Sequence, residues 1–174
     1  MLSNAFANSW PGEYDFCPRC GSTMATETRW GRPRRVCQAC RWVHFRNPGV
    51  GVAVLLRDES GRVLLVRRAP GSTREGAWCI PCGYLDYGEE VRAGAAREVR
   101  EETGLIVDVG EPVFVRSNFH DPAKLTVGIW FLGVISGGRL TAGDDADDVA
   151  WFDTDDLPDL AFPTDEELLG SLRG

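Results

Sequence analysis

Three glutamates in one short segment are spaced to share one side of a helix. Glu98, Glu101 and Glu102 stand at positions i, i+3 and i+4, which fall within an arc of about 100° on an α-helix. Like charges at this spacing repel one another. The arrangement becomes favourable if divalent cations bind there, because Mg²⁺ and Mn²⁺ prefer carboxylate oxygens. We therefore predict a metal-dependent catalytic site on the ridge that Glu98, Glu101 and Glu102 form along the helix.

Three neighbouring residues are candidates to support that site. Arg97 lies one turn before Glu101, so the two side chains can pair and orient each other. Gly83 lies where a loop begins and can offer its backbone carbonyl to the metal. Glu89 precedes the expected helix, where it is either a charge that suits the helix dipole or an outer metal contact.

The segment from Gly83 to Leu105 resembles the box of the Nudix hydrolase family, G-x5-E-x7-R-E-U-x-E-E-x-G-U, where U is aliphatic. All nine specified positions match: Gly83, Glu89, Arg97, Glu98, Val99, Glu101, Glu102, Gly104 and Leu105. The preceding Trp78-Cys-Ile-Pro-Cys-Gly83 is similar to the family's W-x-L-P-G-G, with Cys82 replacing the first glycine.

This resemblance implies an α/β/α sandwich with a mixed sheet that hydrolyses a nucleoside diphosphate linked to another group. It implies that Glu98, Glu101, Glu102 and the Gly83 carbonyl bind Mg²⁺ (or Mn²⁺), while Arg97 holds the glutamates in place. The general base would be Glu101, Glu102 or an acid from a downstream loop. Asp148 is the downstream candidate, and its competitors are the neighbouring acids Asp144, Asp145 and Asp147.

A second constellation consists of four cysteines. Cys17 and Cys20 form one C-x-x-C pair, and Cys37 and Cys40 form another after sixteen intervening residues. Two such pairs supply the four thiolates of a closed tetrahedral zinc site, so we predict a structural zinc ion. The remaining pair, Cys79 and Cys82, is interpreted as two small, partly buried side chains.

The elements that must position these residues indicate an α+β protein in two domains. The turn-forming Asn47-Pro48-Gly49 divides a zinc ribbon at 1–47 from a Nudix hydrolase domain at 48–174. The second part is expected to begin with a β-hairpin of strands 50–57 and 62–68. The other expected elements are a short strand at 78–81, a helix at 90–103, strands at 106–116, 124–135 and 149–152, and a terminal helix N-capped by Thr164.

The substrate class is inferred from branches of the family that this sequence resembles. A zinc ribbon joined to a Nudix domain is similar to NADH pyrophosphatases and ADP-ribose pyrophosphatases. The region from Ser117 to Lys124 keeps little of the S-Q-P-W-P-F-P-x-S motif of the NADH branch. We therefore expect ADP-ribose, or a dinucleotide such as FAD or NAD(H), to be cleaved with release of AMP. Phe119 and His120 are candidates to stack on a base or ribose.

Charge and composition set the alternatives. The first 47 residues hold seven arginines against three acidic residues, whereas the whole chain carries a net charge of −7. Two alternatives therefore remain. In one, the substrate is an NAD-capped RNA; in the other, the ribbon binds nucleic acid and the Nudix box is vestigial. With 43% hydrophobic residues, no apolar run long enough to span a bilayer and no secretory signal, we expect a globular cytoplasmic protein. The family resemblance implies a homodimer.

Overall fold

The computed structural model describes residues 14–118 and 124–172. The chain divides into two compact units, Met1–Asn47 and Pro48–Gly174. Phe119 and His120, the candidates for stacking on a base, lie outside the described residues. In the described ranges, neither α-helix has the length and apolar composition needed to cross a membrane.

The first unit is built on one antiparallel hairpin of β1 (Met24–Arg29) and β2 (Arg32–Cys37). Trp30 and Gly31 form its two-residue turn with φ values of 50° and 74°, the backbone sign that suits the twist of a tight hairpin. Beneath the hairpin, Trp42 packs against the buried Cys17, Met24 and Cys37. This apolar cluster is small, so the thiols themselves make up much of the interior.

The second unit contains two sheets. The four-stranded sheet has the order β6-β3-β8-β7, and the three-stranded sheet has the order β5-β4-β9. Strands β3 and β8 are parallel and all other pairs are antiparallel, so the larger sheet is mixed. The elements are β3 (Gly49–Leu56), β4 (Val63–Arg68), β5 (Trp78–Cys79), β6 (Cys82–Tyr84), α1 (Val91–Thr103), β7 (Leu105–Asn118), β8 (Thr126–Gly138), β9 (Ala146–Phe152) and α2 (Pro163–Gly170).

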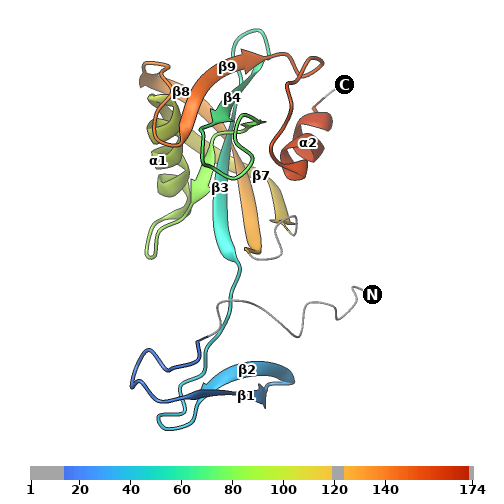
Figure 1. Cartoon of the computed structure of the whole chain (residues 1–174). Coiled ribbons are helices and arrows are strands. Elements are labelled where there is room, and N and C mark those ends of the chain that lie inside the picture. The colour runs from blue at the N-terminus through green and yellow to red at the C-terminus, as the bar shows by residue number, and fades with distance from the viewer. Residues whose placement is uncertain (1–13, 119–123, 173–174) are drawn as a thin grey trace. The chain divides into compact units, whose positions relative to one another are not determined.

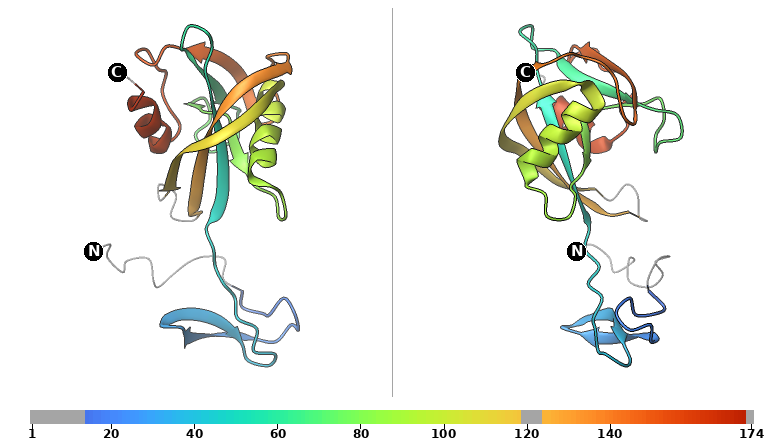
Figure 2. Two further views of the ribbon diagram at one scale, coloured as in Figure 1. Left: turned by 180° about the vertical axis from the view of Figure 1, so that it is seen from behind. Right: turned by 90° about the vertical axis from the view of Figure 1, so that its left-hand side faces the viewer.

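Helices α1 and α2 lie on opposite sides of this unit (Figures 1 and 2). Strand β3 shows how the sequence achieves this, because its alternate side chains enter different clusters. Val52 and Val54 pack with the α1 residues Ala95 and Val99. Ala53 and Leu55 instead pack in a cluster with the α2 residues Leu168 and Leu169. The expected sandwich of helices around a mixed sheet is therefore confirmed.

The expected hairpin of the first two strands is wrong in its pairing. Strands β3 and β4 are present, but they belong to different sheets and share only a single bridge between Arg57 and Val63. Strand β3 is buried along most of its length and pairs with β6 and β8. The apolar content of both strands therefore reflects burial between layers rather than pairing with each other.

Helix α1 begins and ends with specific caps. The side chain of Glu90 accepts hydrogen bonds from the backbone N–H groups of Arg92 and Ala93, and Gly104 closes the helix with a φ of 69°. These caps fix the helix along its length. The expectation of a helix at 90–103 is thus confirmed, with Glu90 as the N-cap.

The expected N-cap of the terminal helix is wrong. Helix α2 begins at Pro163, its N-cap position is Phe162, and no side chain caps it. Proline at the first helical position starts the helix through its fixed φ. The hydroxyl of Thr164 therefore lies inside the first turn, where it has no hydrogen-bond partner.

Candidate active site

Strand β6 and helix α1 bring Gly83 against Glu98. Gly83 pairs with Val52 of β3, and α1 packs over the same strands. A Cβ atom on Gly83 would overlap the carboxyl group of Glu98. Only glycine therefore permits the β6 backbone to approach this carboxylate so closely.

Arg97 is the centre of the hydrogen bonds at this site. Its Nε and Nη2 atoms donate to the two carboxylate oxygens of Glu89 at 2.8 and 2.9 Å. Its Nη1 atom donates to Glu98 at 2.8 Å and to Glu101 at 2.9 Å. Nη2 also donates to the carbonyl of Tyr84 at 3.1 Å. One guanidinium thus holds three carboxylates and the end of β6 in a single geometry.

The third glutamate of the ridge is held differently. Glu102 is 1% exposed, and its Oε2 accepts a hydrogen bond from the backbone N–H of Cys82 at 2.9 Å. Burial raises the pKa of Glu102 well above its ordinary value. Burial also raises the pKa of Glu98, against the opposing effect of Arg97. Two carboxylates kept from water in this way are well suited to bind a cation that restores their charged form.

Glu89 has the opposite character. Hydrogen bonds from Arg97 and from the backbone N–H of Asp86 lower the pKa of Glu89 to about 2. Glu89 is therefore ionised near neutral pH and paired with Arg97. This geometry makes Glu89 a support for the guanidinium.

The acidic loop before β9 places its aspartates in different environments. Asp148 lies 3.4 Å from Arg67 Nη2, and Asp147 bonds the same guanidinium at 2.7 Å. Asp144 has a φ of 52° and lies near enough to Glu98 to contribute to the raised pKa of that carboxyl. Two acids of this loop act on the ridge, since Asp144 contributes to the raised pKa of Glu98 and Asp145 to that of Glu102. The unusual backbone of Asp144 was not visible in the sequence.

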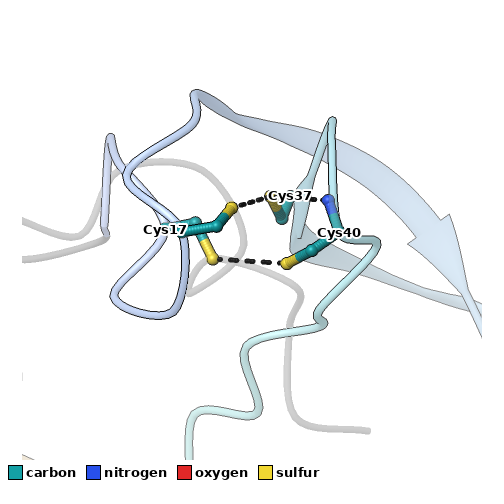
Figure 3. A group of neighbouring side chains, drawn as sticks. Cys17, Cys37 and Cys40 are labelled. Atoms are coloured by element: carbon teal, nitrogen blue, oxygen red, sulfur yellow. Dashed lines mark hydrogen bonds between the residues drawn. The ribbon is translucent and has the colours of Figure 1, made fainter.

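The four cysteines of the first unit meet as their spacing predicts (Figure 3). The Sγ atoms of Cys17 and Cys40 are 3.7 Å apart, and those of Cys20 and Cys37 are 3.5 Å apart. Four sulfurs at about 2.3 Å from a zinc ion stand about 3.8 Å from one another. In the described part of the chain, all six cysteines are free thiols. The cluster therefore fits a zinc ion.

The last cysteine pair lies beside the carboxylates. Cys79 is fully buried, whereas Cys82 is half-buried and gives its backbone N–H to Glu102. A hydrogen bond with Cys79 and burial raise the pKa of the Cys82 thiol well above its ordinary value. The Cys82 thiol is therefore not activated as a nucleophile. The role of Cys82 in positioning Glu102 through its backbone was missed from the sequence.

Comparison with known families decides the identity of the second unit. The NUDIX domain family matches residues 47–171. The chain belongs to the NUDIX family. The matched range includes Arg97 and the whole carboxylate ridge.

This NUDIX chain resembles several characterised proteins. It is 33% identical over 130 residues to the ADP-ribose pyrophosphatase of Methanocaldococcus jannaschii, covering 74% of this chain and 76% of that protein. It is 32% identical over 154 residues to the NAD-capped RNA hydrolase NudC of Stutzerimonas stutzeri, covering 87% of this chain and 52% of that protein. The chain thus spans about half the length of the NudC relative.

The fold is also matched among solved structures. A NUDIX hydrolase from Nitrosomonas europaea superposes with a TM-score of 0.78 at 29% identity, covering 90% of this chain and 88% of that chain. A likeness over nine-tenths of the chain confirms the NUDIX fold of the second unit.

Proposed function

We propose that the protein is a divalent-cation-dependent pyrophosphohydrolase that cleaves a nucleoside diphosphate linked to another group. The observation that carries this proposal is the set of three carboxylates held by Arg97 beside the close approach of Gly83. The residues fit hard cations, since the donors are carboxylate and carbonyl oxygens, and Glu98 and the neighbouring Glu102 are shielded from water.

Each residue has a role in this proposal. Glu98, Glu101, Glu102 and the Gly83 carbonyl would hold Mg²⁺ or Mn²⁺. When bound, the ions neutralise the pyrophosphate and lower the pKa of an attacking water. Arg97 positions Glu98 and Glu101 and does not itself react.

Glu101 is the general base that we propose. It is the most exposed of the three glutamates, with 44% of its side chain accessible, so water can reach it. Glu102 is buried and already accepts the backbone N–H of Cys82, so it is poorly placed to take a proton from the attacking water. Asp144 is the downstream alternative, because its charge already acts on Glu98.

The substrate class that we propose is ADP-ribose or a related dinucleotide such as FAD or NAD(H), with AMP as one product. A relative of which the chain covers 76% is named an ADP-ribose pyrophosphatase. The NudC relatives, which are named NAD-capped RNA hydrolases, also point to an adenine dinucleotide.

The test is a product screen with matched variants. ADP-ribose, FAD, NADH, NAD⁺, diadenosine polyphosphates and nucleoside triphosphates are incubated with Mg²⁺, and AMP or phosphate is measured. We expect AMP from ADP-ribose and a loss of about 10²–10³ in kcat for Glu101→Gln, as for removal of an essential catalytic group. Glu111→Gln, a glutamate whose side chain is 85% exposed, is the control. Full activity in Glu101→Gln would refute the assignment.

A second candidate substrate is an RNA with a capped 5′ end. The ribbon carries an exposed aromatic pair, Trp30 and Phe45, whose ring centroids are 5.5 Å apart, and Arg34 lies 4.6 Å from the Phe45 ring centroid. Stacked aromatic and guanidinium groups are typical of surfaces that bind unpaired bases. NAD-capped RNA would then be hydrolysed faster than free NAD⁺, with an advantage that falls steeply as salt rises.

The ribbon and the assembly complete the proposal. We propose that the four thiolates hold one structural zinc ion, which requires a reducing compartment such as the cytoplasm.

We also propose a homodimer, supported by Leu132 and Val134, which lie two residues apart on β8 and are 46% and 69% exposed. Sedimentation of the wild type and of Val134→Lys tests this, with a dimer expected only for the wild type.

A further inference from the structure

Helix α2 contributes one buried acidic side chain to the second unit. Asp165 lies in the first turn of α2 and is 1% exposed. Its Oδ1 atom accepts a hydrogen bond from Trp130 Nε1 at 2.9 Å, and its Oδ2 atom accepts one from the backbone N–H of Ile80 at 3.1 Å. Both donors are neutral, so they offset only part of the free energy that burial of a carboxylate costs. Aspartate is rarely buried to this extent, and its contacts therefore point to a role other than packing.

The contact with Ile80 lies at the start of the segment that reaches the carboxylate ridge. Residues 80–83 lead from β5 into β6, and so from the three-stranded sheet into the four-stranded sheet. Within this segment, the backbone N–H of Cys82 donates to Glu102 at 2.9 Å. The next residue, Gly83, approaches Glu98 so closely that a Cβ would overlap its carboxyl group. A shift of the segment would therefore move the Gly83 carbonyl and Glu102 together, and the proposed function assigns both to the metal.

Backbone contacts hold the segment on both sides of Ile80. Before it, the carbonyl of Trp78 accepts a hydrogen bond from the N–H of Ala161 at 2.7 Å. After it, the carbonyl of Pro81 accepts one from the N–H of Val54 at 3.1 Å, and proline itself has no N–H to donate. Between these contacts, the N–H of Ile80 bonds instead to the carboxyl group from α2. A side chain thus supplies the acceptor at this point of the segment.

On its α2 side, the segment borders a cavity. The cavity has a volume of about 230 Å³, and Cys82, Gly83 and Asp165 are among the residues that line it. Atoms beside a cavity lack packing partners on one side, so packing holds this part of the segment less firmly than a filled core would. The hydrogen bonds of residues 80–83 therefore gain importance for its position. The floor of the cavity consists of small residues of the four-stranded sheet: Gly51, Ala53 and Gly128.

We propose that Asp165 is a positioning residue for the metal site, acting through the backbone N–H of Ile80 to hold the segment that carries Cys82 and Gly83. The proposal rests on the proposed function for the identity of the metal ligands. It does not require Asp165 to touch the ion or the substrate. The bond from Trp130 orients the carboxyl group, because it engages one oxygen while the other accepts from Ile80. Helix α2 thereby acts on a ridge that belongs to α1, on the opposite side of the unit (Figures 1 and 2).

The first experiment measures metal affinity without any substrate. Mn²⁺ is titrated into the full chain, prepared with zinc in the ribbon, and free Mn²⁺ is measured by electron paramagnetic resonance. Asp165→Ala removes both acceptor oxygens and so releases the N–H of Ile80. We expect the Kd for Mn²⁺ to rise about tenfold or more, as for loss of groups that orient metal ligands. An unchanged Kd in the folded variant would overturn the proposal.

A matched variant separates positioning from stability. Leu168→Ala also removes a buried side chain of α2 and destabilises the unit through the cavity that it leaves, but the carboxyl group of Asp165 remains. We expect Leu168→Ala to bind Mn²⁺ as the wild type does. If it weakened Mn²⁺ binding as much as Asp165→Ala, loss of α2 packing would explain both results and the proposal would be overturned.

Asp165→Leu covers the case in which Asp165→Ala fails to fold. Leucine keeps the branched shape and replaces both acceptor oxygens with methyl groups, so it removes the hydrogen bonds without leaving a void. We expect the same rise of about tenfold or more in the Kd for Mn²⁺. A folded Asp165→Leu with the affinity of the wild type would overturn the proposal.

Hydrolysis provides the second readout. We expect the Mg²⁺ concentration at half-maximal rate to rise about tenfold in Asp165→Leu. A substitution that merely lowered the folded fraction would lower kcat and leave this concentration unchanged, and that result would contradict a positioning role. A wild type that binds Mn²⁺ but releases AMP from no diphosphate would instead refute the proposed function, while the Kd values would still decide the role of Asp165.

Discussion

At the scale of single residues, the guanidinium of Arg97 determines where the carboxylates lie. It donates to Glu89, Glu98 and Glu101 at 2.8–2.9 Å. A planar group with several fixed N–H donors can do this, whereas an ammonium is a single point charge. The identity of this arginine therefore matters beyond its charge.

Replacing Arg97 by lysine should disorder the site while keeping the charge. We expect Arg97→Lys to lower kcat/KM for the diphosphate substrate by about 10–100-fold, as for loss of groups that orient metal ligands. Arg100→Lys, an exposed arginine on the same helix, is the control and should retain activity. Steady-state kinetics at saturating Mg²⁺ measures both. Equal activity of Arg97→Lys and the wild type would show that charge alone is sufficient.

Asp165 should make the stability of the second unit depend on pH. Burial raises the pKa of Asp165 to about 7, above its value of 3.8 when exposed, so the folded state retains a proton that the unfolded state releases. The contribution of Asp165 to the free energy of unfolding is therefore fully present below about pH 4. It is lost as the pH rises to about 7, and the total loss is on the order of 4 kcal/mol at most.

The variant Asp165→Asn removes this titration. Urea unfolding of the wild type and the variant at several pH values between 4 and 7.5, without divalent cations, gives the difference in free energy of unfolding. Because Glu98 and Glu102 titrate in both proteins, their effects cancel in the difference. We expect Asp165→Asn to become progressively more stable relative to the wild type as the pH rises. A difference that does not change with pH would contradict the raised pKa.

The sequence was sufficient to find the residues of the ridge but not their hydrogen bonds. Spacing alone places Glu98, Glu101 and Glu102 on one side of a helix. It does not show that Glu102 is buried against a backbone N–H, because that contact joins residues twenty positions apart. Burial, and not spacing, separates the chemical roles of these glutamates.

At the scale of elements, the contact of β6 with α1 depends on one missing side chain. A methyl group on Gly83 would overlap the carboxyl group of Glu98. We expect Gly83→Ala to lower activity at least about 100-fold, because a displacement of about 1 Å at reacting groups has an effect of this size. Gly137→Ala is the control. Activity assays with urea unfolding as a folding check measure both, and an active Gly83→Ala would show that β6 can move away.

Strand pairing was the least predictable level of the fold. Val50–Arg57 and Arg62–Arg68 are separated by a turn sequence, which normally joins hairpin strands. The structure uses that turn to pass from one sheet to the other. The same turn residues can join two strands of a hairpin or two strands of different sheets. Only the pairing of β3 with β8 and of β4 with β9 distinguishes these arrangements.

At the scale of the whole molecule, the ribbon should depend on its metal while the second unit should not. The buried interior of the ribbon is little more than Cys17, Met24 and Cys37 with Trp42 beside them, too small to stabilise a fold alone. We expect one zinc per chain by atomic absorption, and none in Cys37→Ser. Cys79→Ala, which removes a thiol of the second unit, is the control.

Limited proteolysis provides the second readout for zinc removal. Trypsin should cleave Cys37→Ser within the arginine-rich residues 14–47 and leave the second unit intact. Simultaneous digestion of both units would contradict their independence.

The two faces of the four-stranded sheet carry different tasks. The carboxylates belong to the α1 face, the glycine-floored cavity belongs to the α2 face, and Gly83 borders both. Substitutions at Gly51 and Ala53 therefore alter the cavity on one face of the sheet while the carboxylates of the catalytic helix lie on the other. Gly128 is not open to the same change, because a Cβ there would approach the Trp130 indole to 2.5 Å.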